Sequence, residues 1–130
     1  MTNVELRNAQ KQVYNHTSTA GLLSDLAGVL VKFVYHLSPD CYFARTSPIA
    51  SEWGLRPKNW ITFYFSAGRR GSDPKVIVSL HVLPKDLEGY TSLEIGQGSH
   101  PQWSKFTVDN IGKLREALDS ISEAHRKSVD

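Results

Sequence analysis

Two stretches of alternating side chains in the middle of the sequence constrain the fold more than any other feature. In residues 59–66, Ile61, Phe63 and Phe65 occupy every second position, and apolar residues recur with the same period in residues 75–83. A period of two is typical of a β-strand that buries one of its faces. The intervening segment 67–74 is short and rich in Gly, Ser and Asp, so we predict that the two strands form an antiparallel hairpin.

Residues on both sides of this hairpin show helical periodicity instead. In the first half of the chain, apolar residues three or four positions apart predict a nearly buried helix that ends at Ser38 and Pro39. Near the C-terminus, Asp109 or Asn110 is expected to cap a second amphipathic helix. The sequence predicts a polar helix over residues 3–14. We expect residues 1–16 to dock only loosely onto the rest of the domain. The two apolar stripes consist of Leu22, Leu26, Leu30, Phe33 and Leu37, and of Ile111, Leu114, Leu118, Ile121 and His125.

Three shorter strands complete the predicted sheet, at residues 41–46, 91–95 and 104–108. Residues 47–57 are expected to be irregular, because Pro48, Gly54 and Pro57 interrupt regular structure. We therefore predict a single α+β domain over residues 1–130, with an antiparallel sheet of four or five strands. Both apolar helices are expected to pack on one face of that sheet, since only that face offers a matching apolar surface.

Composition and charge exclude several classes of protein. The hydrophobic fraction of 40% and charged fraction of 22% describe a globular domain and exclude a disordered chain. A single cysteine, Cys41, excludes both a disulfide framework and a thiolate zinc site, and we expect no metal and no cofactor. The apolar run 20–37 contains Asp25, Lys32 and His36, so we expect no membrane segment and a cytoplasmic location.

The positive charge is concentrated in the centre of the sequence. Residues 45–85 hold seven Lys and Arg residues against Glu52 and Asp73, a local net charge of +5, whereas the whole chain has +2. The predicted alternation places a mixed aromatic and basic surface on the second face of the sheet. We predict that this surface contacts a partner, through Trp60, Tyr64, Lys75 and His81 and, from the hairpin tip, Arg69 and Arg70.

Three interpretations of this surface remain open from the sequence. Other parts of the chain, residues 1–16 or 47–57, could cover it, and Trp60 would then be a packing residue. It could instead bind a partner protein or a second copy of the chain, since Tyr, Trp and Arg are enriched in interfaces. It could also bind nucleic acid, with aromatic rings stacking on bases and basic side chains contacting phosphates.

The alternative functional hypothesis is a small enzyme or a small-ligand-binding domain. Its polar site would include His81, His100 and Arg69. Histidines and carboxylates occur in almost any chain, and the sequence contains neither an HExxH zinc motif nor a GxSxG nucleophile motif. We therefore favour a non-catalytic interaction domain.

Overall fold

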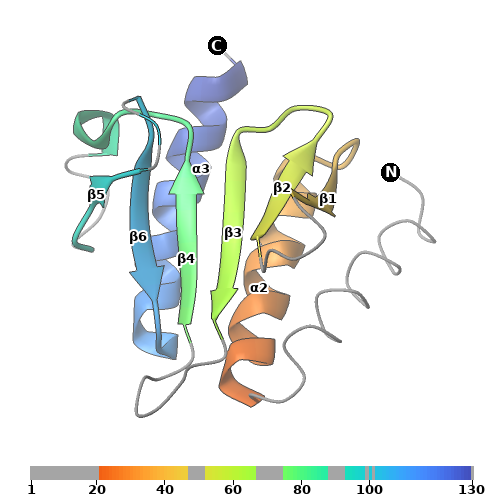
Figure 1. Cartoon of the computed structure of the whole chain (residues 1–130), viewed down its shortest axis with the longest axis vertical. Coiled ribbons are helices and arrows are strands. Elements are labelled where there is room, and N and C mark those ends of the chain that lie inside the picture. The colour runs from red at the N-terminus through yellow and green to blue at the C-terminus, as the bar shows by residue number, and fades with distance from the viewer. Residues whose placement is uncertain are drawn as a thin grey trace.

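The chain forms two layers, with a six-stranded sheet on one side and two long helices on the other (Figure 1). In this computed structural model, the described residues are 21–46, 52–66, 75–87, 93–98, 100 and 102–129. Helices α2 (Gly21–Leu37) and α3 (Leu114–Val129) both lie against the same face of the sheet. The predicted α+β class and the placement of both helices on one face are therefore confirmed.

All neighbouring strands of the sheet are antiparallel, in the order β1-β2-β3-β4-β6-β5. The predicted central hairpin is confirmed, because Phe63 in β3 pairs with Val78 in β4. Strand β6 lies between β4 and β5, although it follows β5 in the sequence. The strands are β1 (Tyr42–Arg45), β2 (Glu52–Arg56), β3 (Ile61–Ser66), β4 (Lys75–Leu80), β5 (Gly96–Gln97) and β6 (Ser104–Val108). Two short 3₁₀ helices, η1 (Pro84–Leu87) and η2 (Ile111–Lys113), complete the described elements.

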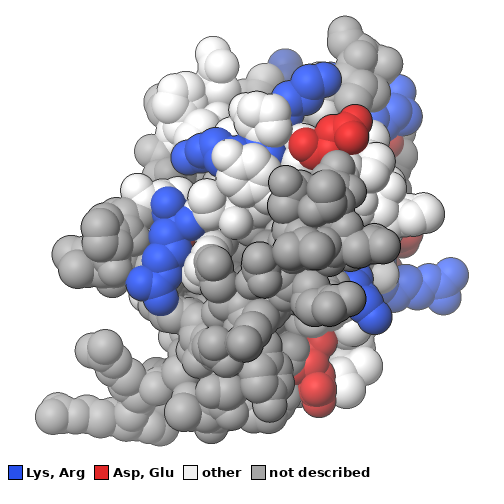
Figure 2. Space-filling view, turned by 90° about the vertical axis from the view of Figure 1, so that its right-hand side faces the viewer, with Lys and Arg blue, Asp and Glu red and all other residues white. Residues whose placement is uncertain are grey.

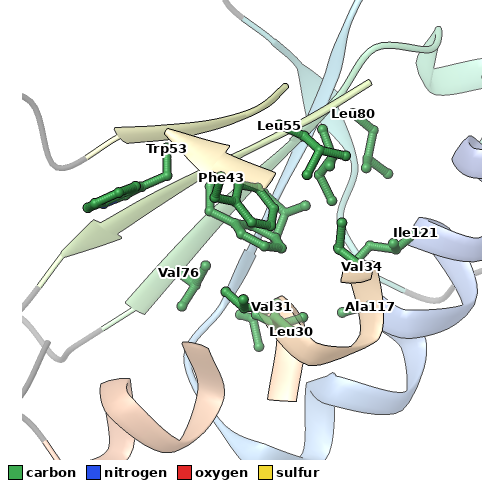
Figure 3. Close-up of a cluster of buried hydrophobic side chains, with 14 of the residues drawn as sticks. Leu30, Val31, Val34, Phe43, Trp53, Leu55, Val76, Leu80, Ala117 and Ile121 are labelled. Carbon is green, nitrogen blue, oxygen red and sulfur yellow. The ribbon is translucent and has the colours of Figure 1, made fainter. Parts of the chain in front are cut away.

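Apolar side chains from both layers meet in one core. In Figure 3, Leu30 and Val34 of α2 and Ile121 of α3 point toward the same face of the sheet. The sheet supplies alternate residues to this core, as the period of two predicts: Ile61, Phe63, Phe65, Val76, Val78 and Leu80 are all at most 2% exposed. Full burial of each such side chain stabilises the fold by roughly 1.5–3 kcal/mol.

A buried hydrogen bond joins the first helix to the edge of the sheet. The hydroxyl of Tyr35 in α2 accepts a bond from the backbone N–H of Phe43 in β1, at 3.1 Å. The two rings also pack against each other, with centroids 5.6 Å apart. Burial raises the pKa of Tyr35 to about 12, so the hydroxyl stays protonated at neutral pH.

Two strand predictions were wrong in position. Residues 52–56, expected to be irregular, form β2, because Pro48 and Pro57 lie outside the strand and leave its interior free to pair. At Gly54 inside β2, a Cβ would lie 3.0 Å from the Nη1 atom of Arg56, so the absence of a side chain leaves room for the guanidinium. In the predicted strand 91–95, the described residues 93–95 are not a strand, and β5 begins at Gly96.

The sheet therefore has six strands, where four or five were expected. The predicted strand 75–83 ends earlier, at Leu80. The predicted N-terminal helix and the docking of residues 1–16 lie outside the described residues. Neither of the long helices in the described ranges combines the length and the apolar character that a bilayer crossing requires.

Candidate functional site on the outer face of the sheet

The sheet face turned away from α2 and α3, which we call the outer face, carries mostly polar side chains. Strand pairing defines its rows, because residues opposite each other in a sheet point to the same side. Across β3, β4 and β6 it is formed by Thr62, Tyr64, Ser66, Lys75, Ile77, Ser79, Lys105 and Thr107. Strands β1 and β2 extend it with Tyr42, Ala44, Glu52, Gly54 and Arg56.

Two tyrosines are the exposed aromatic residues of this face. Tyr64 lies in the middle strands and is 42% exposed, and Tyr42 lies on the edge strand β1 and is 47% exposed. Three basic residues share this face: Lys75 is diagonal to Tyr64 across β3 and β4, Lys105 lies on β6, and Arg56 lies four residues along β2 from Glu52, the partner of Tyr64. Glu52 accepts a hydrogen bond from Thr46 Oγ1 at 2.9 Å.

The predicted position of Trp60 on this face is wrong. Trp60 precedes β3, and its side chain packs on the helical side, where it is 6% exposed. The indole Nε1 donates to Ser38 Oγ at 3.1 Å, and its ring lies 5.1 Å from that of His125 in α3. Burial and the nearby charge of Lys58 lower the pKa of His125. The alternation of β3 therefore begins at Ile61, and Trp60 is a core residue.

The remaining predicted residues that the structure describes are spread along the outer face. Tyr64 and Lys75 lie on it, and His81 follows directly after β4. At about 3.3 Å per residue, Lys75 and His81 lie about 20 Å apart along the strand. Arg69 and Arg70 lie outside the described residues. These side chains thus line an extended surface and do not converge on one point.

One end of the outer face carries an aromatic and histidine cluster that the sequence only partly predicted. The rings of His81 and Trp103 are stacked, with centroids 3.8 Å apart and an angle of 3° between their planes. The ring of His100 packs against the same indole, with ring centroids 5.0 Å apart. The strand register explains this stack. Leu80 pairs with Ser104, so His81, which follows Leu80, and Trp103, which precedes Ser104, both point to the outer face. The alternative site had included His81 and His100, but it missed Trp103.

Polar groups from β2 and β3 complete this end of the face. The side-chain amide of Asn59, in the orientation that satisfies both of its neighbours, accepts from Arg56 Nη1 at 2.9 Å and donates to the Ile61 carbonyl at 3.2 Å. Thr62 Oγ1 lies 3.5 Å from His81 Nε2. We call Arg56, Asn59, Thr62, His81, His100 and Trp103 the His81 cluster.

Burial is the main influence on the protonation of His81 and lowers its pKa below 6.5. A hydrogen bond to the backbone of Asn59 opposes this shift. Electrostatic interaction with His100 and Arg56 adds to the lowering. At neutral pH the free protein therefore holds His81 as the uncharged imidazole.

Two hollows adjoin this architecture. A groove of about 630 Å³ lies between β6, the segment 93–96 and the start of α3, and its charged lining residues are of both signs: Glu94, Lys105, Lys113 and Glu116. A smaller hollow of about 270 Å³ lies beside Trp60 and His125. In the described ranges, no group of three His, Cys, Asp or Glu residues is arranged to hold a metal ion.

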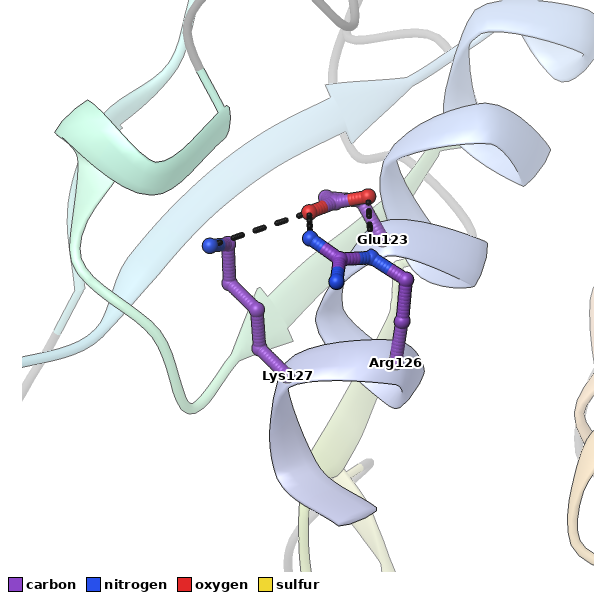
Figure 4. A network of polar contacts seen from close by, with 3 residues as sticks. All are labelled: Glu123, Arg126 and Lys127. Atoms are coloured by element: carbon purple, nitrogen blue, oxygen red, sulfur yellow. Dashed lines mark hydrogen bonds and ion pairs between the residues drawn. The ribbon is translucent and has the colours of Figure 1, made fainter. Parts of the chain in front are cut away.

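Charged side chains elsewhere are paired or dispersed. On α3, Glu123 accepts hydrogen bonds from Arg126 and lies 3.7 Å from Lys127 Nζ (Figure 4). The Arg126 guanidinium holds the pKa of Glu123 below its usual value. Figure 2 shows the side of the molecule nearest β1 and β2, where Lys and Arg form several separate groups. The outer face is therefore the better candidate for a binding site.

Comparison with known proteins gives no match. No protein-family model fits the sequence, and no curated protein or solved structure shows significant similarity to the chain. The functional argument therefore rests on the residues of the outer face.

Proposed function

We propose that the chain is a non-catalytic binding domain whose outer sheet face contacts single-stranded nucleic acid. The observation that carries this proposal is the exposed ring of Tyr64 on a face that also carries Arg56, Lys75 and Lys105 at separate points along its strands. Proteins that bind single strands combine aromatic side chains, on which bases stack, with basic side chains along the phosphate backbone. A single strand suits this surface because its bases, unlike those of a duplex, can be splayed onto an exposed ring.

The composition of the face favours nucleic acid over a second copy of the chain. A stable self-association surface is usually apolar at its centre. With Trp60 in the core, the neighbours of Tyr64 on β3 and β4 are Thr62, Ser79 and Ile77, so the apolar area is small. Among its described residues, the face also carries three basic residues against one acidic residue, Glu52, so it offers little charge complementarity to a second copy of itself.

A small-ligand-binding domain is the second candidate, and one observation favours it. His81 and His100, two members of the alternative site, contact the same indole ring of Trp103. Stacked rings beside an arginine could hold a planar anionic molecule. The same surface can serve a nucleotide within a strand, so the experiment below compares oligonucleotides with mononucleotides.

The direct test is fluorescence anisotropy with labelled poly-dT and poly-rU oligonucleotides, with a DNA duplex and a mononucleotide as competitors. Replacing Tyr64 by Ala removes one stacked base, an effect of about 1–3 kcal/mol, which corresponds to roughly 5- to 150-fold weaker binding. Val29→Ala is the matched control, because Val29 is also 42% exposed but lies on α2. We expect this control to bind as the wild type does.

Salt dependence supplies a second readout. Three phosphate contacts, by Arg56, Lys75 and Lys105, correspond to a slope of about −2 in log K against log salt, or roughly 20-fold weaker binding between 50 and 200 mM salt. Absence of oligonucleotide binding at low salt, or equal binding by Tyr64→Ala and wild type, would refute the proposal. A dimer detected by light scattering and abolished by Tyr64→Ala would establish the self-association interpretation instead.

A further inference from the structure

We infer that Arg56, His81 and His100 form an anion site for a phosphoryl group at one end of the outer face. The inference rests on the proposed function for its natural ligand, the backbone phosphate of a single strand. A free phosphate or a nucleotide carries the same chemistry, and the test separates these sources.

Contacts within the His81 cluster place the three groups around one region. Arg56 and His81 bond to the same residue, since Arg56 Nη1 reaches the side chain of Asn59 and His81 bonds to its backbone. His81 and His100 are held by Trp103, whose ring contacts both imidazoles. The three groups therefore come from separate segments of the chain but are linked through two shared neighbours.

Donor groups remain available in this region. A guanidinium has five N–H donors, and the hydrogen bonds of Arg56 to Leu55 and Asn59 both come from Nη1. Arginine is well suited to phosphate, because it can offer two parallel N–H groups to two oxygens. A protonated imidazole donates from both nitrogens, so His81 gains a donor when it becomes charged. The Nδ1 atom of His100 accepts from the backbone N–H of Gln102 at 3.3 Å, so its Nε2 is the nitrogen that could bond an anion.

The electrostatics of the free protein favour an anion at this position. The groups facing His81 are Arg56 of β2, the Asn59 backbone, Thr62 of β3, and His100 and Trp103 before β6. The two titratable groups that act on His81, His100 and Arg56, both lower its pKa, and no carboxylate of the described residues is among the groups that act on it. Lys105, two residues after Trp103, adds a further positive charge on the same face. A bound phosphate would offset this mutual repulsion.

The sign of the pH dependence follows from this arrangement. A bound anion favours the charged imidazole, so binding raises the pKa of His81 and takes up a proton. Affinity for the anion should therefore increase as the pH falls from 8 to 6. A rise of one pKa unit on binding gives at most about tenfold tighter binding, and because the free pKa of His81 lies below 6.5, roughly threefold of this is reached at pH 6.

The test measures the binding of three probes at pH 6 and pH 8: inorganic phosphate, a mononucleotide and the oligonucleotide. We expect roughly threefold tighter oligonucleotide binding at pH 6 than at pH 8 for the wild type, and no such change for His81→Gln. Arg56→Gln should weaken binding at both pH values. His36→Gln is the matched control, because His36 is exposed on α2, in the other layer.

A second measurement needs no variant. In an NMR titration of the wild type, the pKa of His81 should rise on addition of ligand, whereas the imidazole signals of His36 should not respond to the ligand. This measurement decides the question if His81→Gln fails to fold.

The possible results separate the two proposals. Oligonucleotide binding that does not change with pH, with an unshifted His81 pKa, overturns the anion site and leaves the proposed function standing. Binding of phosphate or the mononucleotide with the expected pH response, but not of the oligonucleotide, supports the anion site and overturns nucleic-acid binding. Failure of all three probes to bind overturns both.

Discussion

Replacing Trp60 separates its role in packing from the role in partner binding that the sequence suggested. The side chain is 6% exposed and contacts the ring of His125 in α3. Truncating a buried tryptophan to alanine costs about 3–5 kcal/mol, because it removes apolar contacts and leaves a cavity. Domains of this size have about 5–15 kcal/mol of stability in total, so Trp60→Ala should remove a large part of it.

Smaller changes test the individual contacts of Trp60. Trp60→Phe keeps an aromatic ring but loses the hydrogen bond to Ser38, which is 3.1 Å long, and should cost about 1 kcal/mol for that bond in addition to lost packing. Ser38→Ala leaves the indole N–H unpaired, which should cost about 1–3 kcal/mol. The double variant Trp60→Phe with Ser38→Ala should cost less than the sum, because both changes remove the same bond.

The assay is urea unfolding followed by far-ultraviolet circular dichroism. Tyr64→Ala is the control, since its exposed side chain should contribute about 1 kcal/mol or less. Trp60→Phe should retain oligonucleotide binding, because Trp60 does not lie on the outer face. The reasoning is refuted if Trp60→Ala loses less than about 1 kcal/mol, or if Trp60→Phe folds fully and no longer binds.

Three further substitutions test contacts in both layers. Tyr35→Phe leaves the buried N–H of Phe43 without its acceptor and should cost about 1–3 kcal/mol in urea unfolding; a neutral result would show that water replaces the hydroxyl. Gly98→Ala places a Cβ 3.0 Å from Trp103 Cβ, so it should cost about 1–3 kcal/mol and shift the Trp103 ring resonances; an unchanged spectrum would contradict the close approach. Gly28→Ala meets no atom within 4 Å on the exposed side of α2 and should raise stability by about 1 kcal/mol, measured by thermal unfolding; a loss would contradict the open environment.

The features that the sequence predicted well depend on local periodicity. The alternation of Ile61, Phe63 and Phe65 sets which side chains of β3 face the helices, whatever the strand pairs with. The same applies to the stripe of α2 that contains Leu26 and Leu30. Fold class, the central hairpin and the inner face of the sheet followed from such patterns.

The features that it missed depend on contacts between distant segments. Trp60 continues the alternation of β3 in the sequence, but the chain bends before Ile61 and the bond to Ser38 holds the indole among the helices. Trp103 joins His81 because of the pairing between β4 and β6, whose register no local pattern encodes. The positions of Tyr64 and Lys75 on the outer face were therefore predictable, and His81 and His100 were already candidates, but the contact of Trp103 with both histidines was not predicted.

The position of β6 in the sheet limits how much of the fold can form while the chain is still being synthesised. When synthesis has reached Trp103, five of the six strands have been made, but β4 still lacks its neighbour on one side. The apolar side of the sheet is also half uncovered at that stage, because α3 and its buried residues Ala117 and Ile121 come last. A nascent or prematurely terminated chain thus presents a bare strand edge beside an apolar surface, the combination that most invites aggregation and chaperone capture.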